Sequence, residues 1–170
     1  MYATIFLLCF SVALLFLVSA CENKDDDAVQ LGHEFINELY SVDDPNVDVS
    51  KMSTGQLIEA QKELSTYFTE KEFKDLTTKR LFLIPLEIAS MQNSKISVQD
   101  IVIKEDLDQE KGDSFYFDHS FTLMFTNRNG KKIDEMEVKG QMTIVDTGDG
   151  LKIDRYYEGK NLLDMLNPIK

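Results

Sequence analysis

The chain has 170 residues, enough for one domain, and its 43% hydrophobic and 28% charged residues are ordinary for a globular protein. Its net charge of −12 argues against nucleic-acid binding, which needs a basic surface, and against adhesion to anionic lipids by charge alone. Residues 1–20 contain no charged side chain, and 17 of these 20 are apolar. A polytopic membrane protein is excluded, because this is the one stretch apolar enough to span a bilayer.

The first 20 residues have the pattern of an export signal. An apolar run over 5–18 ends in the small residues of Val18-Ser19-Ala20-Cys21, after which the chain becomes strongly polar. This motif resembles the lipobox of bacterial lipoproteins. The resemblance implies that residues 1–20 are removed and that Cys21 carries a diacylglyceryl, palmitate-type lipid anchor. Residues 1–4 lack the usual Lys or Arg, so an ordinary signal peptide and an uncleaved anchor helix stay as alternatives.

The cysteines agree with this interpretation. Cys9 would leave with the signal and Cys21 would be lipidated, so the fold must rest on its core rather than on a disulfide. The two acyl chains of a diacylglyceryl group anchor a protein stably. We expect 21–27 to be an acidic tether that anionic headgroups repel. Lys outnumbers Arg 15 to 3, which favours an AT-rich genome and the outer face of a Gram-positive cell membrane.

Residues 28–170 are predicted to form a single α+β domain, because helical patterns precede strand patterns along the chain. Helical spacing of apolar residues predicts a first helix over 28–41, capped by Asp26 or Asp27. Capping-box patterns begin a second helix at Ser53 and a third at Thr69. Pro85 interrupts the apolar run that follows, which predicts a buried turn or a broken helix.

Strand patterns occupy 95–158. The apolar alternation shifts phase between Val98 and Ile101, which indicates a β-bulge. Residues 115–125 alternate without interruption and predict a long strand. A last strand over 151–157 follows the turn residues 146–150, and a short helix is expected near 160–166.

Asn129-Gly130 predicts a type I′ hairpin turn in which Arg128 pairs with Lys131. In this register apolar residues of the two strands face each other, so turn chemistry and side-chain phase agree. The predicted pairs are Phe115 with Ile144, Phe117 with Met142, Phe121 with Val138, and Leu123 with Met136.

Helices followed by a long, bulged antiparallel meander resemble the NTF2-like (cystatin-like) superfamily over about residues 28–158. The resemblance rests on element order and strand length rather than on a motif. It implies a curved sheet wrapped around a long helix, which leaves a cone-shaped cavity. Enzymes, ligand binders and dimeric interaction modules all occur in that superfamily, so the fold alone does not choose a function.

His119 is the main candidate functional residue, because it lies on the apolar face of its strand and the register places Gly140 opposite it. We expect Arg155 and Tyr157 on the same face of the last strand. The four residues would line a ligand site, with His119 as a proton or hydrogen-bond donor and Arg155 as an anion clamp. The alternative is that Gly140 lets the sheet bend while His119 and Arg155 have structural roles.

Other chemistry is not indicated. Asp118-His119-Ser120 has the residue types of a hydrolase triad, but neighbours on a strand point to opposite faces. Two histidines and one lipidated cysteine give no metal-ligand spacing, and no cofactor motif occurs. Residues 146–150 are interpreted as a turn, because a calcium loop that begins at Asp146 would have glycine at its third and fifth positions and Tyr157 at its twelfth.

The leading hypothesis is a membrane-anchored, extracytoplasmic binding or protein-interaction module without catalysis. The NTF2-like cone or the outward sheet face would contact a partner protein or a small ligand, and the outward face around Met124 is a candidate homodimer surface. The alternative hypothesis is an isomerase or dehydratase-type enzyme that uses His119 as an acid or base in the cone.

Overall fold

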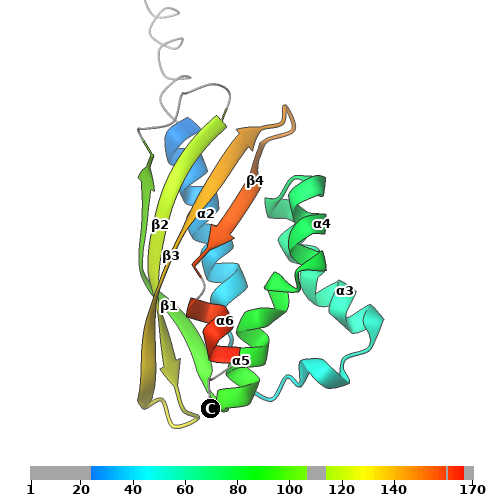
Figure 1. Ribbon diagram of the computed structural model, residues 1–170, viewed down its shortest axis with the longest axis vertical. Coiled ribbons are helices and arrows are strands. Elements are labelled where there is room, and N and C mark those ends of the chain that lie inside the picture. The colour runs from blue at the N-terminus through cyan, green and yellow to red at the C-terminus, as the bar shows by residue number, and fades with distance from the viewer. Residues whose placement is uncertain (1–23, 107–113, 160, 167–170) are drawn as a thin grey trace, which may run out of the picture.

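A long helix packs against one face of a four-stranded antiparallel sheet, and shorter helices complete the domain (Figure 1). The computed structural model describes residues 24–106, 114–159 and 161–166; the predicted signal and Cys21 lie outside the described residues. The predicted α+β class, with helices packed on a curved antiparallel sheet, is confirmed. The helices are α2 (Lys24–Tyr40), α3 (Thr54–Lys62), α4 (Glu70–Thr78), α5 (Ile84–Gln92) and α6 (Asn161–Leu166), with 3-10 turns η1 (Val49–Lys51), η2 (Glu63–Tyr67) and η3 (Leu81–Leu83). The strands, in sheet order, are β1 (Lys95–Glu105), β2 (Ser114–Thr126), β3 (Lys132–Asp146) and β4 (Leu151–Glu158).

Helix α2 begins at Lys24, four residues earlier than the apolar pattern predicted. The predicted caps Asp26 and Asp27 therefore lie inside its first turn, where carboxylates interact favourably with the positive end of the helix dipole. Lys24 also forms an ion pair of 2.7 Å with Asp146 at the end of β3. The second half of the predicted tether is thus helical, and its first residues lie outside the described ones.

Capping chemistry sets the start of α3 and α4 as predicted. Ser53 and Gln56 form a complete capping box, with each side chain bonded to the other residue's backbone N–H. Thr69 accepts from the backbone N–H of Glu72, but the Glu72 carboxylate is directed elsewhere. Pro85 lies in the first turn of α5, where its missing N–H costs nothing, so the apolar run is a broken helix.

The predicted sheet register is confirmed over most of β2 and β3, including Phe121 opposite Val138. The predicted bulge in β1 is also confirmed: the register shifts between Gln99 and Val102, and Asp100 adopts a left-handed φ of 52°. The other predicted pairs are all present: Phe115 with Ile144, Phe117 with Met142, and Leu123 with Met136.

The predicted type I′ turn is wrong. The last ladder pair is Thr126 with Lys132, so Arg128 does not pair with Lys131, and in this turn only Gly130 has a positive φ. The Asn127 side chain accepts from the backbone N–H groups of Asn129 and Lys131 at 2.9 and 3.0 Å. This side-chain cap favours a longer turn with a bulge over the two-residue turn, and the bulge leaves the register beyond it unchanged.

The core lies between α2 and the inner face of the sheet, defined here as the face toward α2. Phe35 is the centre of an aromatic cluster, with its ring 4.9 Å from both Phe68 and Tyr156, measured between centroids. Each fully buried large side chain contributes about 1.5–3 kcal/mol. The largest fully buried side chains include Tyr40, Phe35, Phe121, Phe125, Ile36, Leu123, Met142, Ile144 and Ile153.

Candidate functional site

A row of residues crosses the inner face of the sheet at one level. Ladder partners lie side by side: Ile103 with His119, His119 with Gly140, and Gly140 with Glu158. Cross-strand partners project to the same face, so His119 and Glu158 flank a position that has no side chain. The site therefore combines a buried imidazole, a glycine gap and a carboxylate.

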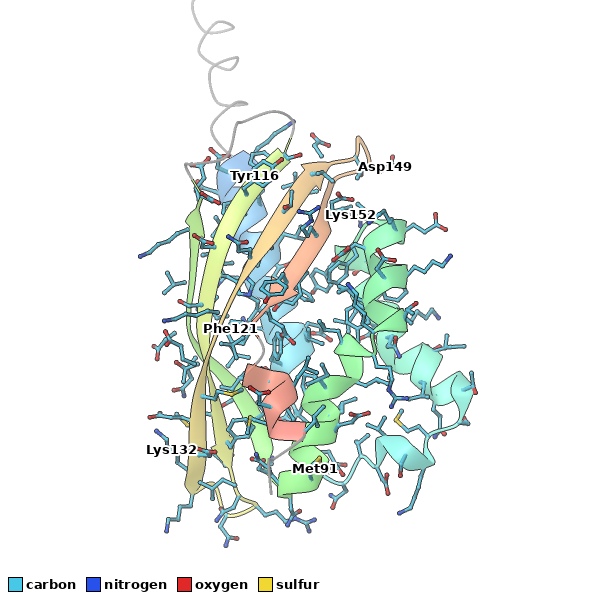
Figure 2. All side chains as sticks on the ribbon, viewed as in Figure 1. Met91, Tyr116, Phe121, Lys132, Asp149 and Lys152 are labelled. Carbon is cyan, nitrogen blue, oxygen red and sulfur yellow. The ribbon has the colours of Figure 1, made fainter. Side chains whose placement is uncertain are left out.

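His119 is enclosed. Its side chain is 3% exposed, and its ring stacks between Tyr156 at 5.2 Å and Phe121 at 5.9 Å, centroid to centroid. Phe121, whose ring stacks with His119, lies about halfway along the sheet (Figure 2). Neither ring nitrogen has a hydrogen-bond partner among the described residues. Burial lowers the pKa of His119 from 6.5 to about 4, so the imidazole is neutral at physiological pH.

Gly140 is required by close packing. A methyl group at this position would lie 2.7 Å from Cε1 and 2.8 Å from Nε2 of His119, and it would overlap the carbonyl oxygen of Tyr157. The glycine therefore makes room for the imidazole and lets β4 approach β3 closely.

Tyr40, Tyr156 and Glu158 form a hydrogen-bonded chain beside this row. The hydroxyls of Tyr40 and Tyr156 are 2.9 Å apart, and the Tyr40 hydroxyl donates to Oε2 of Glu158. Burial raises the pKa of Glu158 from 4.5 to about 7, although the Tyr40 hydrogen bond opposes this. Burial and the neighbouring carboxylate also raise the pKa of both tyrosines. This chain joins the C-terminal end of α2 to the C-terminal end of β4.

Glu72 holds β4 from the other side. Its Oε1 accepts the backbone N–H of Tyr156 at 2.8 Å, and the side chain is 6% exposed. Next to it, the backbone N–H of Thr69 donates to the carbonyl of Ile153. The segment that leads into α4 thus covers part of the outer edge of β4 and satisfies its backbone groups.

Arg155 and Tyr157 do not lie with His119, contrary to the prediction. The register between β3 and β4 shifts between Thr143 and Ile144, so Asp154 is an extra residue and the phase of β4 reverses after it. Tyr156 then faces inward, while Arg155 and Tyr157 are exposed on the opposite, outer face. A ligand-binding role for the predicted residues stays a prediction, with its members on two faces of the sheet.

Sequence reasoning missed Tyr40, Tyr156, Glu158 and Glu72. Tyr40 and Glu158 are 118 positions apart in the sequence, and no local pattern predicts their contact. The local sequence also does not predict that the Glu72 side chain bonds to β4 instead of completing the capping box. The one available signal was the spacing of three between Ile153 and Tyr156, which departs from strict alternation.

The outer face of the sheet is mainly polar. A surface hollow of about 310 Å³ lies on it, and although His119 is among its lining residues, the imidazole is almost fully buried. Met124, predicted to face outward, is only partly exposed, whereas Tyr157 is 57% exposed. The hollow is lined by Val102, Lys104, Asp118, Ser120 and Lys139 in addition to His119 and Gly140.

Within the described ranges, no helix has the length and apolar character needed to cross a membrane. The same residues contain no group of three or more His, Cys, Asp or Glu arranged to hold a metal ion. Chemically, the row offers a neutral, enclosed imidazole and a carboxyl group that accepts a hydrogen bond from one of two linked phenols.

These features define a class of α+β domain in which a long N-terminal helix fills the inner face of an open antiparallel meander. No family model and no curated protein matches the chain. A solved periplasmic fragment of TraM is 15% identical, with a TM-score of 0.51 over 79% of this chain and 96% of that one. An IcmL-like type IV secretion system protein from Legionella pneumophila is 14% identical, with a TM-score of 0.50 over 80% of this chain and 91% of that one. At such identities the likeness shows a shared fold.

Proposed function

We propose that this protein is a membrane-anchored, extracytoplasmic interaction module without catalytic activity. The observation that carries the proposal is the filled inner face of the sheet: His119 is 3% exposed between two aromatic rings, so a substrate has no access to the imidazole. Binding at the surface is then the available mode of action. A fold shared with a periplasmic fragment and with a secretion-system protein supports this proposal.

Export and anchoring complete the proposal. Residues 1–20 would be the signal peptide, Cys21 the lipidated terminus and the rest of the chain, to residue 170, one exported domain of the NTF2-like type. Residues 24–27 of the predicted tether already belong to α2, so the anchored Cys21 would be only three positions from this helix along the chain. The domain would stand close to the outer face of a bacterial cell membrane. The likeness to a periplasmic fragment gives no support to a Gram-positive cell.

The outer sheet face is the proposed contact surface for a partner protein. Arg155 is exposed there beside Tyr157, and Tyr and Arg are enriched among residues that dominate binding energy. Tyr116 lies on the same face, near the end of the sheet at which α2 begins (Figure 2). The polar surroundings suit a partner that associates reversibly rather than a permanent apolar interface.

Lipidation is tested by membrane fractionation of cells that express Cys21→Ser. We expect the variant to accumulate as unprocessed precursor or to leave the membrane, whereas the matched variant Cys9→Ser should fractionate like the wild type. Full membrane retention of correctly processed Cys21→Ser protein would contradict the anchor.

Partner binding is tested by photo-crosslinking in cells. A photoreactive phenylalanine analogue at position 157 should give a discrete adduct, while the same analogue at Met91, which is also exposed but belongs to helix α5 near the bottom of the view in Figure 2, should not. An adduct of twice the chain mass would identify a second copy as the partner. Equal labelling from both positions, or none from either, would count against the outer face.

A further inference from the structure

Glu158 lies where three parts of the fold meet. It is the last residue of β4, its carboxylate accepts from Tyr40 of α2, and Gly159 next to it donates its N–H to the carbonyl of Lys139 at 2.8 Å. Helix α6 follows directly and inserts Leu162, which is fully buried. A change in the position of Glu158 therefore bears on how the end of the sheet and α6 are held.

The surroundings of the Glu158 carboxyl group favour its neutral form. Among the described residues, Tyr40 from α2 and Tyr156 from β4 supply the polar groups beside it, and its row neighbours are Gly140 and His119. No described Lys or Arg forms an ion pair with Glu158, and Asp164 of α6 is exposed. A partly buried carboxylate with one hydroxyl donor is poorly compensated for the water it gives up.

We propose that the site of Glu158 beside Tyr40 is a proton-operated clasp, which holds the end of β4 and the start of α6 against α2 when Glu158 is protonated and releases them when Glu158 ionises. Release follows because the water that the enclosed carboxylate gives up costs more than its hydrogen bond from Tyr40 returns. Because Glu158 ends its strand and is only partly buried, its carboxylate reaches water when the backbone from Gly159 onward moves away from β3, while the ladder before Glu158 stays paired. Tyr40 and Tyr156 keep their mutual hydrogen bond in both states.

The clasp should change state near neutral pH. Burial raises the pKa of Glu158 to about 7, so the clasp changes state between mildly acidic and mildly alkaline solution. His119 does not contribute there, because its pKa of about 4 keeps the ring neutral. The biological use of the clasp rests on the proposed function, since an exported domain meets a pH that the cytoplasm does not buffer.

The test is amide hydrogen exchange of the full-length chain in detergent micelles, measured by NMR at pH 6 and pH 8 and corrected for the intrinsic pH dependence of exchange. The reporter is the Gly159 N–H, and the reference is the Ile96 N–H, which donates to the Val42 carbonyl at 2.9 Å. Protection of Gly159 should fall about tenfold from pH 6 to pH 8, as a single ionisation near pH 7 requires, while protection of Ile96 should stay constant.

Glu158→Gln cannot ionise, so its Gly159 amide should show the same protection at both pH values. Tyr40→Phe removes the donor and should lower Gly159 protection already at pH 6. Glu137→Gln, at an exposed position of β3, is the matched control and should behave like the wild type.

A fall of equal size in Glu158→Gln and the wild type, or constant protection in the wild type, would overturn the clasp. These measurements use purified protein, so that result would leave the proposed location and partner binding untouched. Conversely, loss of the anchor or the partner in cells would leave the clasp intact.

Discussion

Gly140 lies directly beneath the imidazole of His119, so closely that a methyl group at this position would sit 2.7 Å from Cε1 of the ring. Two features that the sequence placed opposite each other are thus locked together by packing. The glycine is needed on its other side as well, because the same methyl group would overlap the carbonyl oxygen of Tyr157. The imidazole could turn away, but the backbone of β4 cannot.

Gly140→Ala should therefore destabilise the protein by about 3 kcal/mol, at the upper end of the usual cost of overpacking, because a backbone atom must move. Urea unfolding followed by far-UV circular dichroism measures the change. Gly55→Ala is the matched control: it has open space around it in the first turn of α3, and alanine there should be neutral or stabilising by up to about 1 kcal/mol. Equal stability of both variants would contradict the packing argument.

Glu72 makes a second prediction about β4. Glu72→Ala leaves the buried N–H of Tyr156 without its acceptor and should cost about 1–3 kcal/mol in the free energy of unfolding. Glu72→Gln keeps an acceptor oxygen and should cost less than half as much. Glu70→Ala, exposed in the same helical turn, should change stability by no more than about 0.5 kcal/mol. A loss in Glu70→Ala as large as in Glu72→Ala would assign the effect to helix α4 rather than to the bond with β4.

Much of the fold was predictable because its information is local. The strict alternation of 115–125 and the phase shift after Val98 fix strand faces and the first bulge by period alone. The bulge at Asp154 was not predictable in the same way, because tyrosines at both 156 and 157 make either phase plausible. The chain from Tyr40 to Glu158 depends on a contact across nearly the whole sequence, which no local pattern encodes.

The hairpin turn, for which the motif Asn129-Gly130 wrongly predicted type I′ geometry, gives a third prediction. Asn127→Ala removes the acceptor for two backbone N–H groups and should destabilise the protein by about 1 kcal/mol, measured by urea unfolding. Asn129→Ala should be nearly neutral, because in this turn the positive φ belongs to Gly130 rather than to Asn129. If Asn129→Ala destabilised the protein more than Asn127→Ala, the result would favour the two-residue turn.

His119 and Glu158 give opposite pH dependences of stability. The pKa of His119 falls from 6.5 to about 4 on folding, so the unfolded chain binds a proton that the folded chain does not, and stability is lost as pH falls through this window. The pKa of Glu158 rises from 4.5 to about 7, so the folded chain keeps a proton that the unfolded chain releases, and stability is lost as pH rises. Between about pH 4.5 and 6.5 the two effects cancel.

Replacing one of these two titratable residues should therefore reveal the pH dependence of stability that the other causes. Relative to the wild type, the unfolding free energy of His119→Leu should fall as pH rises from 4.5 to 6.5, because the Glu158 contribution is then unopposed. Glu158→Gln should show the reverse, a rise with pH over the same interval that reflects the buried neutral imidazole. Each slope should amount to about 1–3 kcal/mol over the window, and urea titrations at half-unit pH steps measure it. Slopes of the same sign in the two variants would mean that the buried row does not bind protons as its geometry and burial require.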